Sequence, residues 1–339
     1  MLFAPEFLRS YNRTAVGLLF IVALASAALL AVCWDQTVEI GGDASSVPVL
    51  IASFGAGLVG STSMVTFFPL ASEYGTTAIT FLSAGVGACG LITQLISFGQ
   101  GVSNGDASLR FSVSVFYWSM TGVLIFCGMG FLGILYDDKL EKVSWATVPR
   151  EDDPVDLEED ATERCARDTD NLIHLFWQYR RIFLNTVFTC VLQFSTTGLL
   201  SYLCDQRADA GTKQSQIFWL TFVYFLGSLI GRFGPGIYQV MSMEISNLIQ
   251  FGLWVYCIVI SNRGHLQKED PNYTLPPVFL STIVMFGFSV CHGYTVTIVF
   301  VAASRESHLV SQWAGVFNQI GALLGALLAF ILVHMGVMQ

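Results

Sequence analysis

SHLVSQWAGVFNQIGALLGALLAFILVHMGVMQ, residues 307–339, is the stretch that decides the fold, because it contains no Asp, Glu, Lys or Arg. A bilayer core about 30 Å thick is crossed by roughly 20 helical residues at about 1.5 Å each. A charged residue at the centre of such a segment costs about 2.5–3.5 kcal/mol on insertion scales. The absence of charge over this length therefore predicts a transmembrane helix.

Eight further charge-free stretches of 18 residues or more precede this one in a chain of 339 residues. Only 12% of the residues are charged, whereas soluble domains carry about 25%. A soluble domain must cover its helices with charged faces, so nine such stretches exclude that class. The predicted fold is an all-α, polytopic transmembrane helical bundle. Its expected spans are 14–33, 48–69, 78–99, 114–135, 182–203, 215–232, 245–262, 279–303 and 312–334.

One long hydrophilic segment divides the predicted spans into two groups. Tyr136 to Asp170 hold 13 acidic and 5 basic residues, which account for most of the chain's net charge of −9. High charge and low hydrophobicity are typical of disorder, so we expect a disordered cytoplasmic loop. The predicted organisation is an N-terminal half of four transmembrane helices (1–135), this acidic loop (136–174) and a C-terminal half of five transmembrane helices (175–339).

The placement of Lys and Arg predicts the orientation in the membrane. With the N-terminus in the cytoplasm, 11 of these residues lie in cytoplasmic segments and 5 in outer segments, with Arg232 counted in a cytoplasmic connection. Cytoplasmic loops are enriched in positive residues, so we expect a cytoplasmic N-terminus and an extracellular C-terminus. The sequon Asn272-Tyr273-Thr274 then lies outside, where Asn272 can be glycosylated.

Glycine recurs at short spacings inside the predicted spans. The pattern G-x-G-x-x-G occurs at 55–60, 85–90 and 128–133, and G-x-x-x-G occurs at 227–231 and 321–325. A dinucleotide site needs a strand before the glycines and a helix that starts at them, and neither is predicted here. We expect close helix–helix contacts instead, because small residues let membrane helices approach one another.

The spans lack the residue patterns of catalysis and metal binding. The sequence holds no H-E-x-x-H, Walker loop or G-x-S-x-G, so we predict no enzyme, no catalytic residue, no metal site and no bound cofactor. Proton- and sodium-coupled carriers commonly use carboxylates inside the membrane, and the predicted spans contain none. This pattern favours the uncoupled movement of a neutral solute.

Uncharged polar and aromatic side chains gather in four of the predicted spans. Such groups can hydrogen-bond to a neutral ligand and stack on it without the cost of burying a charge. For each hydroxyl alone, a bond back to its own helix remains an alternative, and for His292 the alternative is an interhelical hydrogen bond. The predicted solute-binding residues are Thr62, Ser63, Thr66, Thr196, Thr197, His292, Tyr294, Trp313 and Gln319.

Two regions of the chain carry a more specific pattern. The run Gly57–Leu70, GLVGSTSMVTFFPL, places hydroxyl residues before an apolar stretch that ends in Pro, and the pattern continues to Gln100-Gly101. A second pattern extends from Tyr294 to Leu328. Both regions resemble the eukaryotic riboflavin transporter family.

This resemblance implies a fold of eleven spans, six followed by five, similar to that of the equilibrative nucleoside transporters. The first span of this chain then corresponds to the family's third, so the family's first two helices are expected to be missing. The two halves are expected to hold four and five spans. Val86 and Val296 stand where the family often has Glu and Lys, so any role of those charges is absent here.

The function implied by the resemblance is facilitative transport of riboflavin across the plasma membrane by alternating access. The expected partners are the small-molecule substrate and the lipid bilayer, with no nucleic acid. Trp313 and Tyr294 would stack on the flavin, and hydroxyl groups and Gln319 would hydrogen-bond its ring edge or ribityl chain. Two alternatives remain open, namely a nucleoside carrier and a transport-incompetent truncated isoform.

Overall fold

The computed structural model describes residues 5–40, 43–104, 109–136, 172–205, 207–237, 241–269 and 278–334. Within these ranges, nine helices are long and apolar enough to cross a bilayer. This count confirms the predicted all-α bundle. The helices are α1 (Pro5–Cys33), α2 (Val47–Ser72), α3 (Thr76–Gln100), α4 (Val113–Tyr136), α6 (Leu172–Leu199), α7 (Ala210–Ile237), α8 (Met243–Glu269), α9 (Val278–Glu306) and α10 (His308–His334).

Three short elements complete the described structure. An antiparallel hairpin of β1 (Val38–Ile40) and β2 (Asp43–Ser45) joins α1 to α2. The 3₁₀ helices η1 (Val102–Asn104) and η3 (Leu200–Leu203) follow α3 and α6. The hairpin was not expected from the sequence, in which three-residue strands give too short a pattern to recognise.

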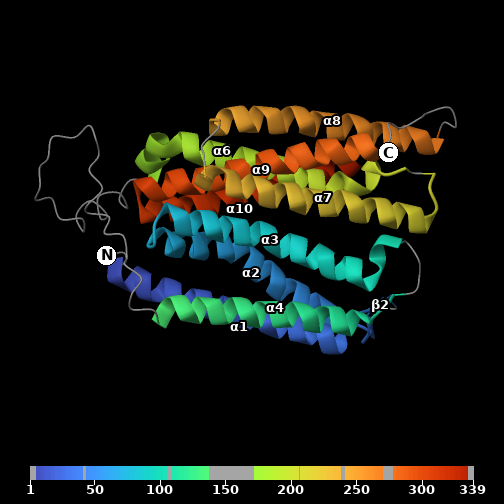
Figure 1. The fold of residues 1–339 in the computed structure, drawn as a ribbon, viewed down its shortest axis with the longest axis horizontal. Coiled ribbons are helices and arrows are strands. Elements are labelled where there is room, and N and C mark those ends of the chain that lie inside the picture. Colours follow the sequence, from blue (N-terminus) through green and yellow to red (C-terminus); the bar gives the residue numbers. More distant parts are fainter. Residues whose placement is uncertain are drawn as a thin grey trace, which may run out of the picture.

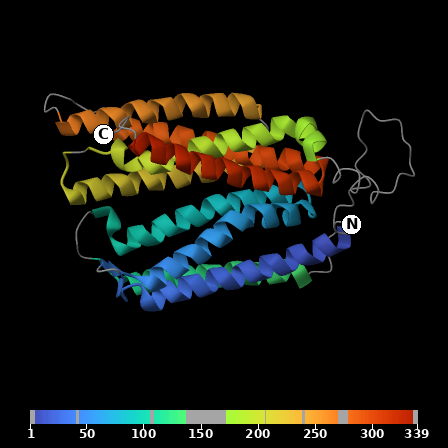
Figure 2. The same ribbon diagram turned by 180° about the vertical axis from the view of Figure 1, so that it is seen from behind.

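The helices form two groups. Figure 1 shows α1 to α4 in its lower part and α6 to α10 in its upper part, and Figure 2 shows the same arrangement from behind. We call helices α1 to α4 the N-terminal half and α6 to α10 the C-terminal half. At one end of the bundle α1 begins, α4 ends and α6 begins, and we call this the α4–α6 end. The β1–β2 hairpin lies at the opposite end, which we call the hairpin end.

Helix α9 is the central element of the C-terminal half. Of its most apolar stretch 72% is buried, and it packs against α6, α7, α8, α10 and the N-terminal helices α2 and α3. A Cβ atom on Gly231 of α7 would collide with the backbone of Val290 in α9. The glycines of α7 therefore let it approach α9 at backbone distance, as small residues do in membrane bundles.

The glycine interpretation is confirmed for some glycines and wrong for others, even within one motif. Gly321 and Gly325 of α10 face α6 closely, because an added Cβ would lie 2.7 Å from the carbonyl oxygens of Val187 and Val191. Gly87 and Gly90 of α3 face α7, and Gly55 of α2 faces α1. A second set has no neighbouring atom within 4 Å of an added Cβ, and it consists of Gly57, Gly60, Gly85, Gly130 and Gly133.

Two predicted boundaries change, and two predictions fall outside the described residues. Helix α6 begins at Leu172, so the last residues of the predicted loop 136–174 are helical. Helix α7 continues to Ile237, which places Arg232 inside a helix, whereas the prediction counts it among the cytoplasmic residues. That assignment was wrong, because a single charge ends a charge-free stretch without ending the helix. Residues 137–171 and Asn272 lie outside the described residues.

Candidate functional site

The two halves meet along a seam where α2 and α3 contact α7, α9 and α10. At the α4–α6 end this seam is filled by buried apolar side chains. The ring of Phe68 in α2 stacks on that of Phe300 in α9, with centroids 3.9 Å apart. Ile79 of α3 belongs to the same cluster and is fully buried. These contacts exclude water from between the halves at this end.

Backbone contact reinforces the seam where α2 crosses α10. A Cβ atom added to Gly315 would lie 2.7 Å from the carbonyl oxygen of Met64 and 2.8 Å from the Cα of Val65. A glycine at this position therefore allows α10 of one half to touch α2 of the other.

Polar groups cross the same seam between α3, α7 and α9. The hydroxyls of Ser83 and Thr297 lie 2.6 Å apart, and both side chains are fully buried. The guanidinium of Arg232 donates through Nη1 to the carbonyl oxygen and the Oγ of Ser83, at 3.3 and 3.0 Å. Its Nε donates to Ser228 of the same helix at 3.2 Å. A buried cation thus joins the two halves.

The seam between α3 and α7 changes character toward the hairpin end. Gly87 and Gly90 hold the two helices together, since added Cβ atoms would collide with Leu229 and Phe225. One to two turns further along, α3, η1 and α7 line an open cleft of about 430 Å³. This volume lies within the range of about 300–1,000 Å³ typical of small-molecule sites. The cleft is lined by Gln94, Ser97, Val102, Ala210, Lys213, Gln214, Ile217, Phe218 and Thr221.

The predicted binding residues of α2 are half-buried, and their hydroxyls are used within the helix. Thr62 donates to the carbonyl of Leu58 at 2.6 Å, and Ser63 donates to that of Gly60 at 3.1 Å. Thr66 donates to the carbonyl of Thr62 at 3.0 Å. These bonds match the alternative stated for single hydroxyls. A hydroxyl oxygen that donates in this way can still accept a hydrogen bond.

The predicted residues of α6 differ from one another in burial. Thr196 is buried and donates to the carbonyl of Leu192 at 2.7 Å. Thr197 is exposed and donates to the carbonyl of Phe194 at 2.9 Å. The two neighbours therefore present different surfaces of one helix.

His292 and Tyr294 of α9 contact elements of their own half. The Nδ1 of His292 lies 3.2 Å from the hydroxyl of Thr189 in α6, which donates to Gln250 of α8 at 2.7 Å. The hydroxyl of Tyr294 donates to the carbonyl of Met241 at 2.7 Å and accepts a bond from its N–H at 3.0 Å. Both side chains are buried and serve contacts between helices.

The predicted residues of α10 lie close to its crossing with α2. Trp313 is half-buried and packs against the apolar cluster of the seam. Gln319 is half-buried and lies about one turn beyond Gly315. Because Gly315 touches α2 at Met64, the crossing brings the predicted residues of α10 near those of α2. The predicted residues of α6 and α9 do not share this crossing.

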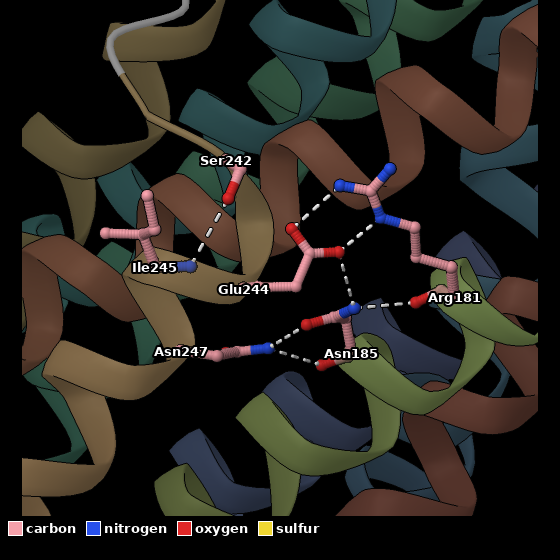
Figure 3. Close-up of polar contacts among 6 residues, drawn as sticks. All are labelled: Arg181, Asn185, Ser242, Glu244, Ile245 and Asn247. Carbon is pink, nitrogen blue, oxygen red and sulfur yellow. Dashed lines mark hydrogen bonds and ion pairs between the residues drawn. The ribbon is translucent and has the colours of Figure 1, made fainter.

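A polar group holds α6 to α8 near the α4–α6 end (Figure 3). Arg181 of α6 forms a two-point ion pair with Glu244 in the first turn of α8. Asn185 lies between the two helices, since it contacts Glu244 and accepts a bond of 2.7 Å from Asn247. All these residues belong to the C-terminal half, so the group stabilises that half and does not cross the seam.

Sequence reasoning missed the polar contacts of the seam, above all Arg232. One signal was available, because Arg232 is the only charged residue between Lys213 and Glu244. An isolated cation in such a long apolar context is typical of a helix interior, where charged residues face other helices or a water-filled cavity.

Comparison with known proteins gives a consistent result along the whole chain. The family model of solute carrier family 52, riboflavin transporter, matches residues 3–338. Riboflavin transporter rft-1 of Caenorhabditis elegans is 24% identical over 94% of this chain and 80% of its own length. Riboflavin transporter 2 of Salmo salar is 23% identical over 90% of this chain and 77% of its own. Member 3-A of the family from Danio rerio is 23% identical, with coverages of 98% and 82%.

Proposed function

Since the chain belongs to the solute carrier family 52 of riboflavin transporters, we propose that it carries riboflavin by facilitated diffusion along the seam between its halves. The family consists of carriers and not of enzymes. The observation that carries the proposal is the asymmetry of the seam. Apolar side chains and backbone contacts fill it at the α4–α6 end, and a cleft large enough for a small molecule opens on it toward the hairpin end.

This asymmetry supports an alternating-access mechanism. In such carriers the halves rock about a central site, which is exposed first to one side of the membrane and then to the other. The described conformation corresponds to a carrier closed at the α4–α6 end. Opening that end requires Phe68 and Phe300 to separate and Gly315 to move away from Met64.

We assign the substrate contacts to uncharged polar and aromatic side chains of both halves. Riboflavin is uncharged, so hydroxyl and amide groups can bind it without a buried counter-charge. Trp313 and Gln319 lie on α10 close in sequence to Gly315, which touches α2 at Met64, and Thr62, Ser63 and Thr66 of α2 supply hydroxyls nearby. Thr196, Thr197, His292 and Tyr294 complete the proposed set, from α6 and α9.

The proposed location is the plasma membrane, with a cytoplasmic N-terminus and an extracellular C-terminus. This orientation follows from the bias of Lys and Arg toward one side. It makes the α4–α6 end cytoplasmic and the hairpin end extracellular, so the described conformation would face outward. Glycosylation of Asn272 would be an independent sign of the same orientation.

Uptake of labelled riboflavin tests the proposed function. Cells that cannot synthesise riboflavin and express this chain should show saturable uptake, and unlabelled riboflavin should compete while uridine should not. Gln319→Leu should raise the KM, whereas Ser119→Ala on α4 should not, because that hydroxyl only bonds its own helix. Competition by uridine alone would favour a nucleoside carrier, and the absence of saturable uptake would refute transport by this chain.

A further inference from the structure

Arg232 is a buried cation in the seam, and its surroundings are neutral. Its side chain is 4% exposed, and it lies within the membrane-spanning part of α7. Its hydrogen-bond acceptors are the oxygens of Ser83 and Ser228. In the part of the chain that the structure describes, no carboxylate lies within ion-pair distance of it.

Glycines in the neighbouring helices leave space in the seam for this side chain. A Cβ atom added to Gly87 of α3 would lie 3.0 Å from the Cδ of Arg232, and one added to Gly293 of α9 would lie 3.2 Å from its Cγ. Two glycines from different halves thus leave room for the aliphatic part of the arginine. The guanidinium then reaches Ser83, whose hydroxyl also contacts Thr297.

Burial of this charge destabilises the conformation in which the seam is closed. Removing an ion from water costs several kcal/mol, and bonds to neutral oxygens return only part of that cost. The cost disappears when the halves part at this end, because water then reaches the guanidinium. The apolar contacts between Phe68, Ile79 and Phe300 stabilise the closed conformation, since they are lost when the seam opens.

We propose that Arg232 controls the opening of the α4–α6 end of the pathway by being stabilised in the open state. Ser83 limits this effect, because it satisfies the guanidinium only while the seam is closed. The inference rests on the alternating-access mechanism given above and adds to it the residue that sets the balance between the two states. Arg232 is a positioning residue in this scheme and does not contact the substrate.

The proposal predicts effects of opposite sign for two neighbouring substitutions. Arg232→Met removes the buried charge, so the closed state of the α4–α6 end should gain population. Ser83→Ala keeps the charge but removes an acceptor, so the same end should open. Arg232→Lys also keeps the charge with fewer hydrogen bonds, and it should act in the direction of Ser83→Ala. A bond to a charged group is worth about 1.5–3 kcal/mol, so we expect roughly tenfold or larger changes in the ratio of the two states.

Hydrogen exchange of the full chain in lipid nanodiscs measures this balance. Peptides from 70–84 and 297–306 report on the α4–α6 end, and peptides from 92–104 and 207–221 report on the hairpin end. Arg232→Met should lower exchange at the first end and raise it at the second. Ser83→Ala and Arg232→Lys should do the reverse. Increased exchange at both ends in all three variants, or unchanged exchange, would overturn the proposal, because the first result indicates simple destabilisation.

Two controls and a transport measurement separate the possible failures. Arg305→Met removes an exposed charge near the same end, and Ser119→Ala removes a hydroxyl that faces away from the seam. Neither should change exchange at either end by more than about twofold, which is below the about tenfold effect expected from bonds to a charged group. If the wild type shows no riboflavin uptake but the variants shift exchange as described, the proposed substrate is wrong while the role of Arg232 stands.

Discussion

Gly315→Ala is the substitution whose effect the structure defines most directly. The added Cβ atom would lie 2.7–2.9 Å from three backbone atoms of Met64 and Val65, where ordinary contacts measure 3.4–4 Å. Helices α2 and α10 must therefore move apart by about 0.7 Å, because backbone atoms cannot rotate away as side chains do. Inserting one methyl group into a well-packed contact costs about 1–3 kcal/mol.

The substitution should destabilise the conformation in which the seam is closed at the α4–α6 end. We expect Gly315→Ala to lower the thermal midpoint of the purified protein and to reduce the maximal rate of riboflavin uptake. Gly57→Ala is the matched control on α2, because its added Cβ has no neighbour within 4 Å. Alanine is favoured over glycine inside a helix by about 0.5–1 kcal/mol, so this control should be neutral or stabilising.

The two variants are compared by fluorescence-monitored thermal unfolding in one detergent and by uptake in the same cell line. A lower midpoint and slower uptake for Gly315→Ala alone would agree with close contact between α2 and α10. Equal midpoints and equal uptake for the two variants would refute the contact, and with it the closed seam.

Three further substitutions test other parts of the structure. Phe68→Ala should destabilise the closed seam by about 3–5 kcal/mol, the usual cost of truncating a buried Phe, and should raise hydrogen exchange in 297–306. Glu244→Gln should cost at most about 1 kcal/mol and leave uptake near the wild-type rate, because Arg181 and Glu244 are 68% and 42% exposed. The Thr212 N–H donates to Asp209 and lowers the pKa of that carboxyl below its ordinary 3.8. The stability it adds is therefore present at neutral pH and lost as pH falls below about 4, so the midpoints of Asp209→Asn and wild type should differ at pH 7 and converge in acid.

The spans of the fold could be predicted from sequence because lipid imposes a simple rule on each helix separately. A charge-free stretch of sufficient length gives one helix, whatever its neighbours are. Contacts between helices follow no such local rule. Gly57 and Gly87 occupy the same position in two separate copies of the G-x-G-x-x-G motif. Gly57 nevertheless has open space beside it, whereas Gly87 faces α7. Which glycine touches a neighbour depends on the crossing of two helices distant in sequence.

The residue types of the candidate site can be selected from sequence, whereas their arrangement in space cannot. Hydroxyl and aromatic residues cluster in α2 and α10, and these helices touch where Gly315 meets Met64, two positions from Thr62 and four from Gln319. His292 and Tyr294 matched the same chemical pattern but contact elements of their own half. The prediction counts Arg232 among the cytoplasmic residues, because its charge ends a charge-free stretch. Its partner, Ser83, lies 149 positions away in the chain, so no local pattern joins them.

The most apolar stretches of α4 and α9 have equal mean hydropathy, yet only 6% of that of α4 is buried in the protein, against 72% of that of α9. Apolar substitutions should therefore be tolerated to different degrees in the two helices. Most side chains of α4 keep exposed surface, so drift among Leu, Ile, Val and Phe there changes few buried contacts. In α9 the same exchanges change a shape that six other helices have to match. Inherited variants of equally conservative chemistry should thus be milder in α4 than in α9.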